Sequence, residues 1–225
     1  MSKLRALLID MDGTLVETES RWWAAERRVM EMHGSTWEED DQNQAIGGPL
    51  FKVVEYMGAK ANVNAEIIFK QIVDEMLDSF SKYKSELLPG WEKIINEARN
   101  QGIKTALVTA SNKVLADALL LNNSFENYFD LVITSDDVVD TKPHPEPYLT
   151  AAKHFGLDVL ECLAFEDSNT GITSSLGAGI PTIALPDRVL LDARRGMRIL
   201  NSLQGLNLND LKDMHKELVK EWQSI

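Results

Sequence analysis

The sequence predicts an α/β fold, with a Rossmann-like parallel sheet as its core and an inserted α-helical cap domain. After residue 88, short apolar runs alternate with helical segments, which is typical of a parallel sheet covered by helices. Between the first apolar run and residue 87, only helical periods are found. Polar residues able to carry chemistry follow several apolar runs, at the sheet edge where open α/β folds hold ligands.

The first strand is expected over Arg5 to Asp10, where the apolar run Leu7-Leu8-Ile9 ends in an aspartate. Asp12 follows two residues later, and because successive strand residues face opposite ways, the two carboxylates share a side. Holding both ionised is unfavourable without a cation, and Mg²⁺ is the natural partner for such oxygen ligands. The alternative is a strand that ends in an acidic turn, because Asp-Gly is a common turn dipeptide.

Helical patterns occupy the stretch that follows. One helix is expected from Glu17 to Gly34, a second after Gly47-Gly48-Pro49, and a third from Asn64 to Tyr83. We interpret residues 17–87 as a cap over a core made of residues 1–16 and 88–225. The linkers Val16–Thr18 and Glu86–Gly90 would then lie side by side and form a hinge.

Alternation of strands and helices resumes after Leu88-Pro89-Gly90. The apolar runs and the helical periods alternate, which predicts a parallel sheet with helices on its faces. Strands are expected near Lys104–Thr109, Leu131–Thr134, Cys162–Glu166, Thr182–Leu185 and Arg198–Asn201, and helices near Trp91–Gln101, Lys113–Asn122, Pro145–Phe155, Thr170–Ala178 and Asn209–Trp222.

Composition excludes several classes of function. The 225 residues carry a formal net charge of -12, which repels phosphate backbones and disfavours nucleic-acid binding. No apolar run approaches the ~18 residues of a membrane span and no signal-peptide pattern precedes the first strand, so we expect a cytoplasmic protein without membrane contact. We also expect a monomer. The single cysteine, Cys162, excludes an internal disulfide and is expected to be a buried strand thiol.

Four segments resemble, in order, the motifs of the haloacid dehalogenase-like superfamily. They begin at Asp10, Leu107, Thr141 and Phe165 and read DMDGTLV, LVTASN, TKPHPEPY and FEDSNTG. The resemblance covers residues 4 to 185 and is closest to the helical-cap subgroup of sugar-phosphate phosphatases and β-phosphoglucomutases. It implies a magnesium-dependent phosphatase acting on a small phosphorylated metabolite, with a sugar or polyol phosphate as the expected substrate.

The first motif supplies the two expected catalytic carboxylates. In the resembled family, the aspartate at the position of Asp10 is the nucleophile that takes up the phosphoryl group as an acyl phosphate. Asp12 is placed to protonate the leaving oxygen and then to deprotonate the attacking water. The family's dehalogenases and phosphonatases lack an aspartate at this second position, so Asp12 points to phosphate esters.

The last motif supplies further ligands for the metal. Glu166 and Asp167 should complete an oxygen-rich magnesium site with the side chain of Asp10 and the backbone carbonyl of Asp12. Glu166 would bind either directly or through water. Taken alone, an acidic pair followed by Ser168 also fits the N-cap of a helix.

The second and third motifs are expected to bind the phosphate. Thr109 resembles the family's phosphate-binding hydroxyl, assisted by the backbone amides of Ala110 and Ser111 at a helix start, although the segment alone fits a simple helix cap. Lys142 matches the family's lysine, which neutralises the nucleophile and the phosphoryl oxygens. Without this context, a lysine before a proline is most often exposed to solvent.

Specificity is expected to come from the cap. The mutases of the subgroup carry a cap histidine ten residues after the acid/base aspartate, and Trp22 stands at that position here, which weakens the mutase interpretation. Trp22 would form an apolar wall, stack on a sugar, or be buried within the cap. Glu17 and the loop around Gly48 are expected to face the site. A sugar phosphomutase and a catalytically silent relative that binds a phosphorylated ligand or a protein remain the alternatives.

Overall fold

The computed structural model describes residues 3–45, 50–186 and 191–224, and confirms the predicted fold class. Within these residues, six parallel strands form one sheet in the order β3-β2-β1-β4-β5-β6. The first strand therefore lies at the centre, between β2 and β4. The strands are β1 (Ala6–Ile9), β2 (Lys104–Val108), β3 (Leu131–Ile133), β4 (Cys162–Glu166), β5 (Thr182–Ala184) and β6 (Met197–Ile199).

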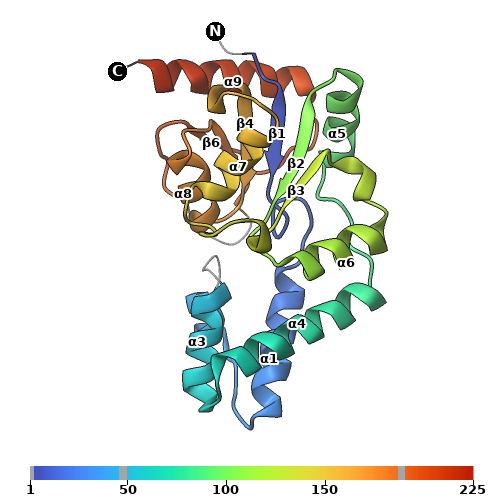
Figure 1. Cartoon of the computed structure of the whole chain (residues 1–225), viewed down its shortest axis with the longest axis vertical. Helices are drawn as coiled ribbons and strands as arrows, with labels where there is room; N and C mark the ends of the chain where they lie inside the picture. The colour runs from blue at the N-terminus through green and yellow to red at the C-terminus, as the bar shows by residue number, and fades with distance from the viewer. Residues whose placement is uncertain (1–2, 46–49, 187–190, 225) are drawn as a thin grey trace.

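Both faces of the sheet are covered, which explains why β1 is apolar at every position. Leu7 and Ile9 pack in a cluster that includes Trp91, while Ala6 and Leu8 pack in a second cluster that includes Tyr148. The covering helices are visible on the two sides of the sheet in Figure 1. The core helices are α5 (Trp91–Asn100), α6 (Lys113–Asn123), α7 (Glu146–His154), α8 (Asn169–Gly177) and α9 (Leu208–Gln223), and short 3-10 turns cover Glu126–Tyr128, Ser135–Asp137 and Val159–Glu161.

The helices that follow β1 form a separate lobe, drawn at the bottom of Figure 1. The long helix of this lobe buries Ile68, Ile72, Met76 and Phe80, which recur every four residues along one face. A short acidic helix without an apolar stripe was not expected from the sequence. The lobe contains α1 (Glu19–Met32), α2 (Glu39–Ala45), α3 (Leu50–Ala61) and α4 (Ala65–Lys82).

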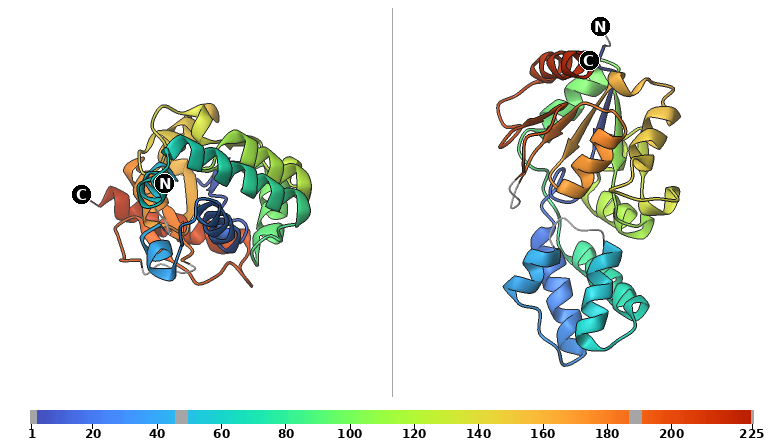
Figure 2. Two further views of the ribbon diagram at one scale, coloured as in Figure 1. Left: turned by 90° about the horizontal axis from the view of Figure 1, so that it is seen from below. Right: turned by 90° about the vertical axis from the view of Figure 1, so that its left-hand side faces the viewer.

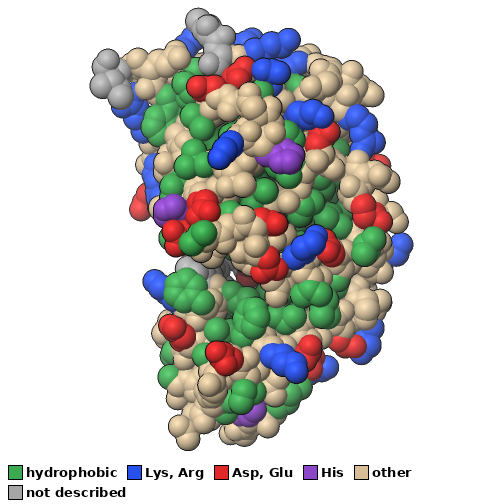
Figure 3. All heavy atoms as spheres, in the orientation of Figure 1, with side chains coloured by type: hydrophobic (Ala, Val, Ile, Leu, Met, Phe, Trp, Pro, Cys, Tyr) green, Lys and Arg blue, Asp and Glu red, His purple; other side chains and the backbone are tan. Residues whose placement is uncertain are grey.

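Two chain segments join the lobes, as the right-hand view of Figure 2 shows. They lie side by side, because Val16 pairs with Leu87 and the Leu88 N–H donates to the Leu15 carbonyl at 2.9 Å. The adjacency of the linkers is as predicted, whereas the domain boundaries and the hinge stay predictions. In Figure 3, a small hollow lies between the lobes on part of the face shown.

Cys162 has the buried environment that the sequence predicts. Cys162 is buried in β4, and burial raises the pKa of its thiol to about 12. Among the described helices, none is long and apolar enough to cross a membrane.

Candidate active site

Strand register brings the predicted residues of different motifs to one edge of the sheet. Ile9 of β1 is level with Leu107 of β2 and with Phe165 of β4, so the residues that follow these three also lie together. Asp10 and Glu166 are therefore neighbours, although they are far apart in the sequence. This edge of the sheet faces the cap lobe.

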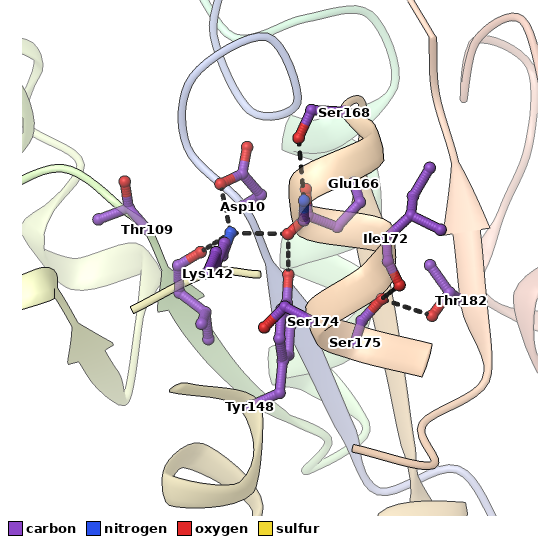
Figure 4. Close-up of polar contacts among 12 residues, drawn as sticks. Asp10, Thr109, Lys142, Tyr148, Glu166, Ser168, Ile172, Ser174, Ser175 and Thr182 are labelled. Atoms are coloured by element: carbon purple, nitrogen blue, oxygen red, sulfur yellow. Dashed lines mark hydrogen bonds and ion pairs between the residues drawn. The ribbon is translucent and has the colours of Figure 1, made fainter. Parts of the chain in front are cut away.

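Lys142 lies at the centre of this group (Figure 4). Its ammonium donates to Asp10 Oδ1 at 2.7 Å, to Glu166 Oε1 at 2.6 Å and to the Val108 carbonyl at 2.7 Å. These three bonds use all three donors of a lysine. The side chain is only 3% exposed, so the solvent-exposed alternative for this lysine is wrong.

The site holds more negative than positive charge. Burial raises the pKa of Asp10, and the charge of Lys142 offsets only part of this effect. Burial also raises the pKa of Glu166 to about 7, and burial together with the charges of Asp10 and Glu166 raises that of Asp167 well above its usual range. Burial alone would lower the pKa of Lys142, but the two carboxylates that it contacts raise it. Three carboxylates around one lysine favour an additional cation.

The donor set fits magnesium. Asp10, Glu166 and Asp167 each offer a carboxylate oxygen within 4.8 Å of the others, and hard divalent cations prefer such ligands. Glu166 Oε2 is buried and accepts no hydrogen bond from any residue that the structure describes.

Two glycines leave room for these acidic side chains. A Cβ on Gly13, whose φ is +78°, would lie 2.2 Å from Asp167 Oδ2, and a Cβ on Gly171 would lie 1.8 Å from Glu166 Oε2. Any side chain at either position would therefore displace a carboxylate of the group. The acidic pair does not cap α8, because Ser168 Oγ accepts from the Gly171 N–H at 3.1 Å.

Asp12 is held by three donors from both lobes. Oδ1 accepts from the Thr18 hydroxyl at 2.5 Å and from the Trp22 indole N–H at 3.1 Å, and Oδ2 accepts from the Ser111 hydroxyl at 2.9 Å. Trp22 thus connects the cap helix α1 directly to the candidate acid/base residue. The sequence did not predict this contact, nor the hydroxyl contacts of Thr18 and Ser111.

Thr109 lies immediately after β2 and is 1% exposed. Its hydroxyl accepts from the Ser111 N–H at 3.0 Å, so that amide already has a partner within the protein. Ala110 between them is half-buried. The phosphate-binding roles of these three residues stay predictions.

Residues 7–185 match the haloacid dehalogenase-like hydrolase family. The chain belongs to this family. A phosphorylated carbohydrates phosphatase of Thermotoga maritima is 30% identical over 187 residues, which cover 80% of this chain and 84% of that protein. Hexitol phosphatase B of Escherichia coli K12 is 27% identical over 188 residues, covering 82% and 84%.

Solved structures share the fold of this haloacid dehalogenase-like hydrolase. A mutant of CbbY from Rhodobacter sphaeroides, crystallised with xylulose-(1,5)bisphosphate, superposes with a TM-score of 0.82. The match covers 93% of this chain and 99% of that protein, at 24% sequence identity. The two-lobed arrangement of sheet and helical insertion is therefore the arrangement of a solved relative.

Sequence reasoning missed one residue of the buried group, and its expectation that Glu17 and the loop around Gly48 face the site stays a prediction. The Tyr148 hydroxyl donates to Glu166 Oε1, and although this tyrosine belongs to the third motif, no role was predicted for it. Gly48 lies outside the described residues. Glu17 accepts from the Ser20 N–H at 3.0 Å and lines a pocket with Gly13 and Asn201.

Proposed function

We propose that this hydrolase is a magnesium-dependent phosphatase that cleaves a small phosphorylated metabolite, a sugar or polyol phosphate, through an aspartyl phosphate on Asp10. The observation that carries the proposal is the buried contact of Lys142 with both Asp10 and Glu166, with Asp167 beside them. Such an arrangement suits a reaction in which negative charge spreads over phosphoryl oxygens.

In the first half of the reaction, a carboxylate oxygen of Asp10 attacks phosphorus and the bond from phosphorus to the ester oxygen breaks. Asp12 gives its proton to the departing oxygen, so the product leaves as an alcohol. Lys142 neutralises Asp10 before the attack and the phosphoryl oxygens during it. Thr109 binds the phosphoryl group with its hydroxyl.

In the second half, Asp12 takes a proton from water as the water oxygen attacks phosphorus. The bond between phosphorus and the Asp10 oxygen breaks, which frees the carboxylate and releases inorganic phosphate. Asp12 is then protonated again and ready for the next substrate. The cap excludes other water molecules while the lobes are closed.

Asp10, Glu166 and Asp167 would hold the magnesium ion, together with the backbone carbonyl of Asp12. The bound ion would supply fixed positive charge next to the phosphoryl oxygens. The sugar or polyol class is supported by the two relatives described above, whose names specify phosphorylated carbohydrates and hexitols.

A sugar phosphomutase is the second candidate. Trp22 argues against it, because an indole N–H donates a hydrogen bond but accepts none and so cannot relay a proton to Asp12. A catalytically silent relative is the third candidate. Asp10, Asp12 and Asp167 are all present, and loss of one of them would be the usual mark of a dead site.

The test is a panel of phosphate monoesters assayed for magnesium-dependent phosphate release. We expect release from sugar or polyol phosphates, loss of release in Asp10→Asn, and no loss in the matched control Asp74→Asn, which changes an exposed aspartate of α4. Incubation with β-glucose 1-phosphate and glucose 1,6-bisphosphate distinguishes a phosphatase from a mutase. Formation of glucose 6-phosphate faster than phosphate release would overturn the phosphatase proposal.

A further inference from the structure

We infer that Tyr148 is a positioning residue that presents one chosen oxygen of Glu166 to the magnesium ion and thereby raises the affinity of the site for metal. This inference rests on the proposed magnesium-dependent function. It concerns a residue of α7 that does not itself contact the ion, and it follows from the way in which hydrogen bonds are divided between the two oxygens of Glu166.

The division is unequal. Oε1 accepts from both the Tyr148 hydroxyl and the Lys142 ammonium, the latter at 2.6 Å. Each carboxylate oxygen has about two lone pairs, so these two donors saturate Oε1. Oε2 has no hydrogen-bond partner in the described part of the chain, and Glu166 is only 1% exposed. A buried acceptor left without a partner costs free energy, which a cation would recover.

The surroundings keep the carboxylate in this orientation. Tyr148 is fully buried, and its ring lies beneath the ammonium of Lys142, 5.2 Å from Nζ to the ring centre. On the other side, the missing side chain of Gly171 makes room for the carboxylate itself, since a Cβ there would lie 1.8 Å from Oε2 and 2.2 Å from Oε1. Figure 4 shows Tyr148 and Lys142 meeting Glu166 at the same oxygen. Rotation of the carboxylate away from this orientation would break both hydrogen bonds.

Removing the Tyr148 hydroxyl alone should loosen this arrangement without changing the packing of the ring. Groups that orient a metal ligand typically contribute 10- to 100-fold to metal affinity. We therefore expect Tyr148→Phe to weaken the binding of magnesium by about tenfold or more. Titration calorimetry with magnesium chloride alone measures this affinity without substrate and without turnover.

The chain offers a matched control in the cap. Tyr56 also donates its hydroxyl to a carboxylate, that of Asp41, at 2.6 Å. Tyr56→Phe removes the same kind of hydrogen bond away from the site, and we expect it to leave magnesium affinity unchanged. An equal loss in both variants would mean that the effect is a general loss of stability, and would overturn the inference.

The outcomes separate this inference from the function on which it rests. Wild-type protein that binds no magnesium would overturn the metal part of the proposed function, and this inference with it. Wild-type binding with unchanged affinity in Tyr148→Phe would overturn the inference alone. A crystal structure of the wild-type protein with magnesium gives a test that needs no variant: we expect Oε2 toward the ion and Tyr148 still on Oε1, and coordination by Oε1 would contradict us.

Discussion

At the scale of single residues, the contact between Trp22 and Asp12 links the cap to the proposed acid/base residue. The indole N–H fixes Asp12 Oδ1 as an acceptor, and the hydroxyls of Thr18 and Ser111 engage the same carboxylate. Hydroxyl groups can both donate and accept, whereas an indole N–H only donates. Trp22 therefore orients Asp12 without exchanging protons with it.

Trp22→Phe tests this role. Phenylalanine keeps an aromatic ring but loses the donor, and we expect kcat to fall about tenfold, because a hydrogen bond to a charged group contributes about 1.5 kcal/mol or more. KM for the best substrate of the panel should change little. The matched control is Trp23→Phe on the same helix, since the Trp23 indole nitrogen has no partner within the described ranges. Equal kcat values in the two variants would contradict a positioning role.

The sequence predicted Asp10, Lys142, Glu166 and Asp167 as one group, because each follows an apolar strand or stands in a recognisable motif. It did not predict the Trp22 contact, because hydrophobic periodicity describes a helix but not its orientation toward another lobe. The sequence did not predict the contact of Tyr148 with Glu166 for a different reason. An aromatic residue at helical spacing looks like core, and Tyr148 is indeed core except for its hydroxyl.

At the scale of elements, strands and long helices were predictable and the short acidic helix α2 was not. Residues 39–45 carry acidic and amide side chains with no apolar stripe, so no period of 3.6 marks them. Their position is fixed by tertiary contacts instead. Trp37 donates its indole N–H to Gln42 Oε1 of α2 at 2.8 Å and to Glu26 Oε2 of α1 at 3.0 Å.

Glu26 makes the stability of the cap depend on pH. Burial raises the pKa of its carboxyl from 4.5 to about 7, so the folded protein binds this proton more tightly than the unfolded chain. Ionisation of Glu26 therefore lowers the free energy of unfolding as pH rises from 4.5 to 7, by up to about 3 kcal/mol. Glu26→Gln should remove this loss, because the amide oxygen can still accept from Trp37.

Urea unfolding at pH 5 and pH 8 measures the effect. We expect Glu26→Gln to be the more stable protein at pH 8 and to show a smaller difference between the two pH values than wild type. Glu55→Gln, an exposed position on α3, serves as the control and should behave as wild type. Parallel pH dependence in wild type and Glu26→Gln would show that another group is responsible.

The hinge is the second prediction at this scale. The end of the cap just before the second linker is tied to α6 of the core, since the Ser85 N–H donates to Asn123 Oδ1 at 2.7 Å and the Asn122 amide donates to the Phe80 carbonyl at 2.5 Å. Arg21 of α1 also donates to the Lys84 carbonyl at 2.7 Å. We expect residues 17–87 to rotate as a unit about the linkers Val16–Thr18 and Glu86–Gly90.

Small-angle scattering with and without magnesium and a phosphate mimic should detect this rotation as a more compact ligand-bound state. Asn123→Ala removes the bond between residue 85 and α6 and should broaden the distribution of sizes in the unliganded protein. Identical scattering curves with and without the ligands would contradict gating by the cap.

At the scale of the whole molecule, the protein is strongly acidic, and its candidate phosphate-binding cation, Lys142, is buried. The net charge of -12 repels anions in general, and Lys142 lies among carboxylates that a metal ion would complement. This group lies at the edge of the sheet that faces the cap lobe. Under the proposed function, the core would carry out the phosphoryl chemistry and the cap would choose the substrate.

The most direct test of this account is rapid-quench mass spectrometry during turnover of the best phosphate ester. We predict that wild-type protein carries one added phosphoryl group on the peptide that contains Asp10, and that Asp10→Asn carries none. Asp12→Ala should accumulate more of this adduct if its hydrolysis is slowed more than its formation. Steady release of phosphate with no adduct on Asp10 at any time point in these proteins would contradict the aspartyl-phosphate mechanism.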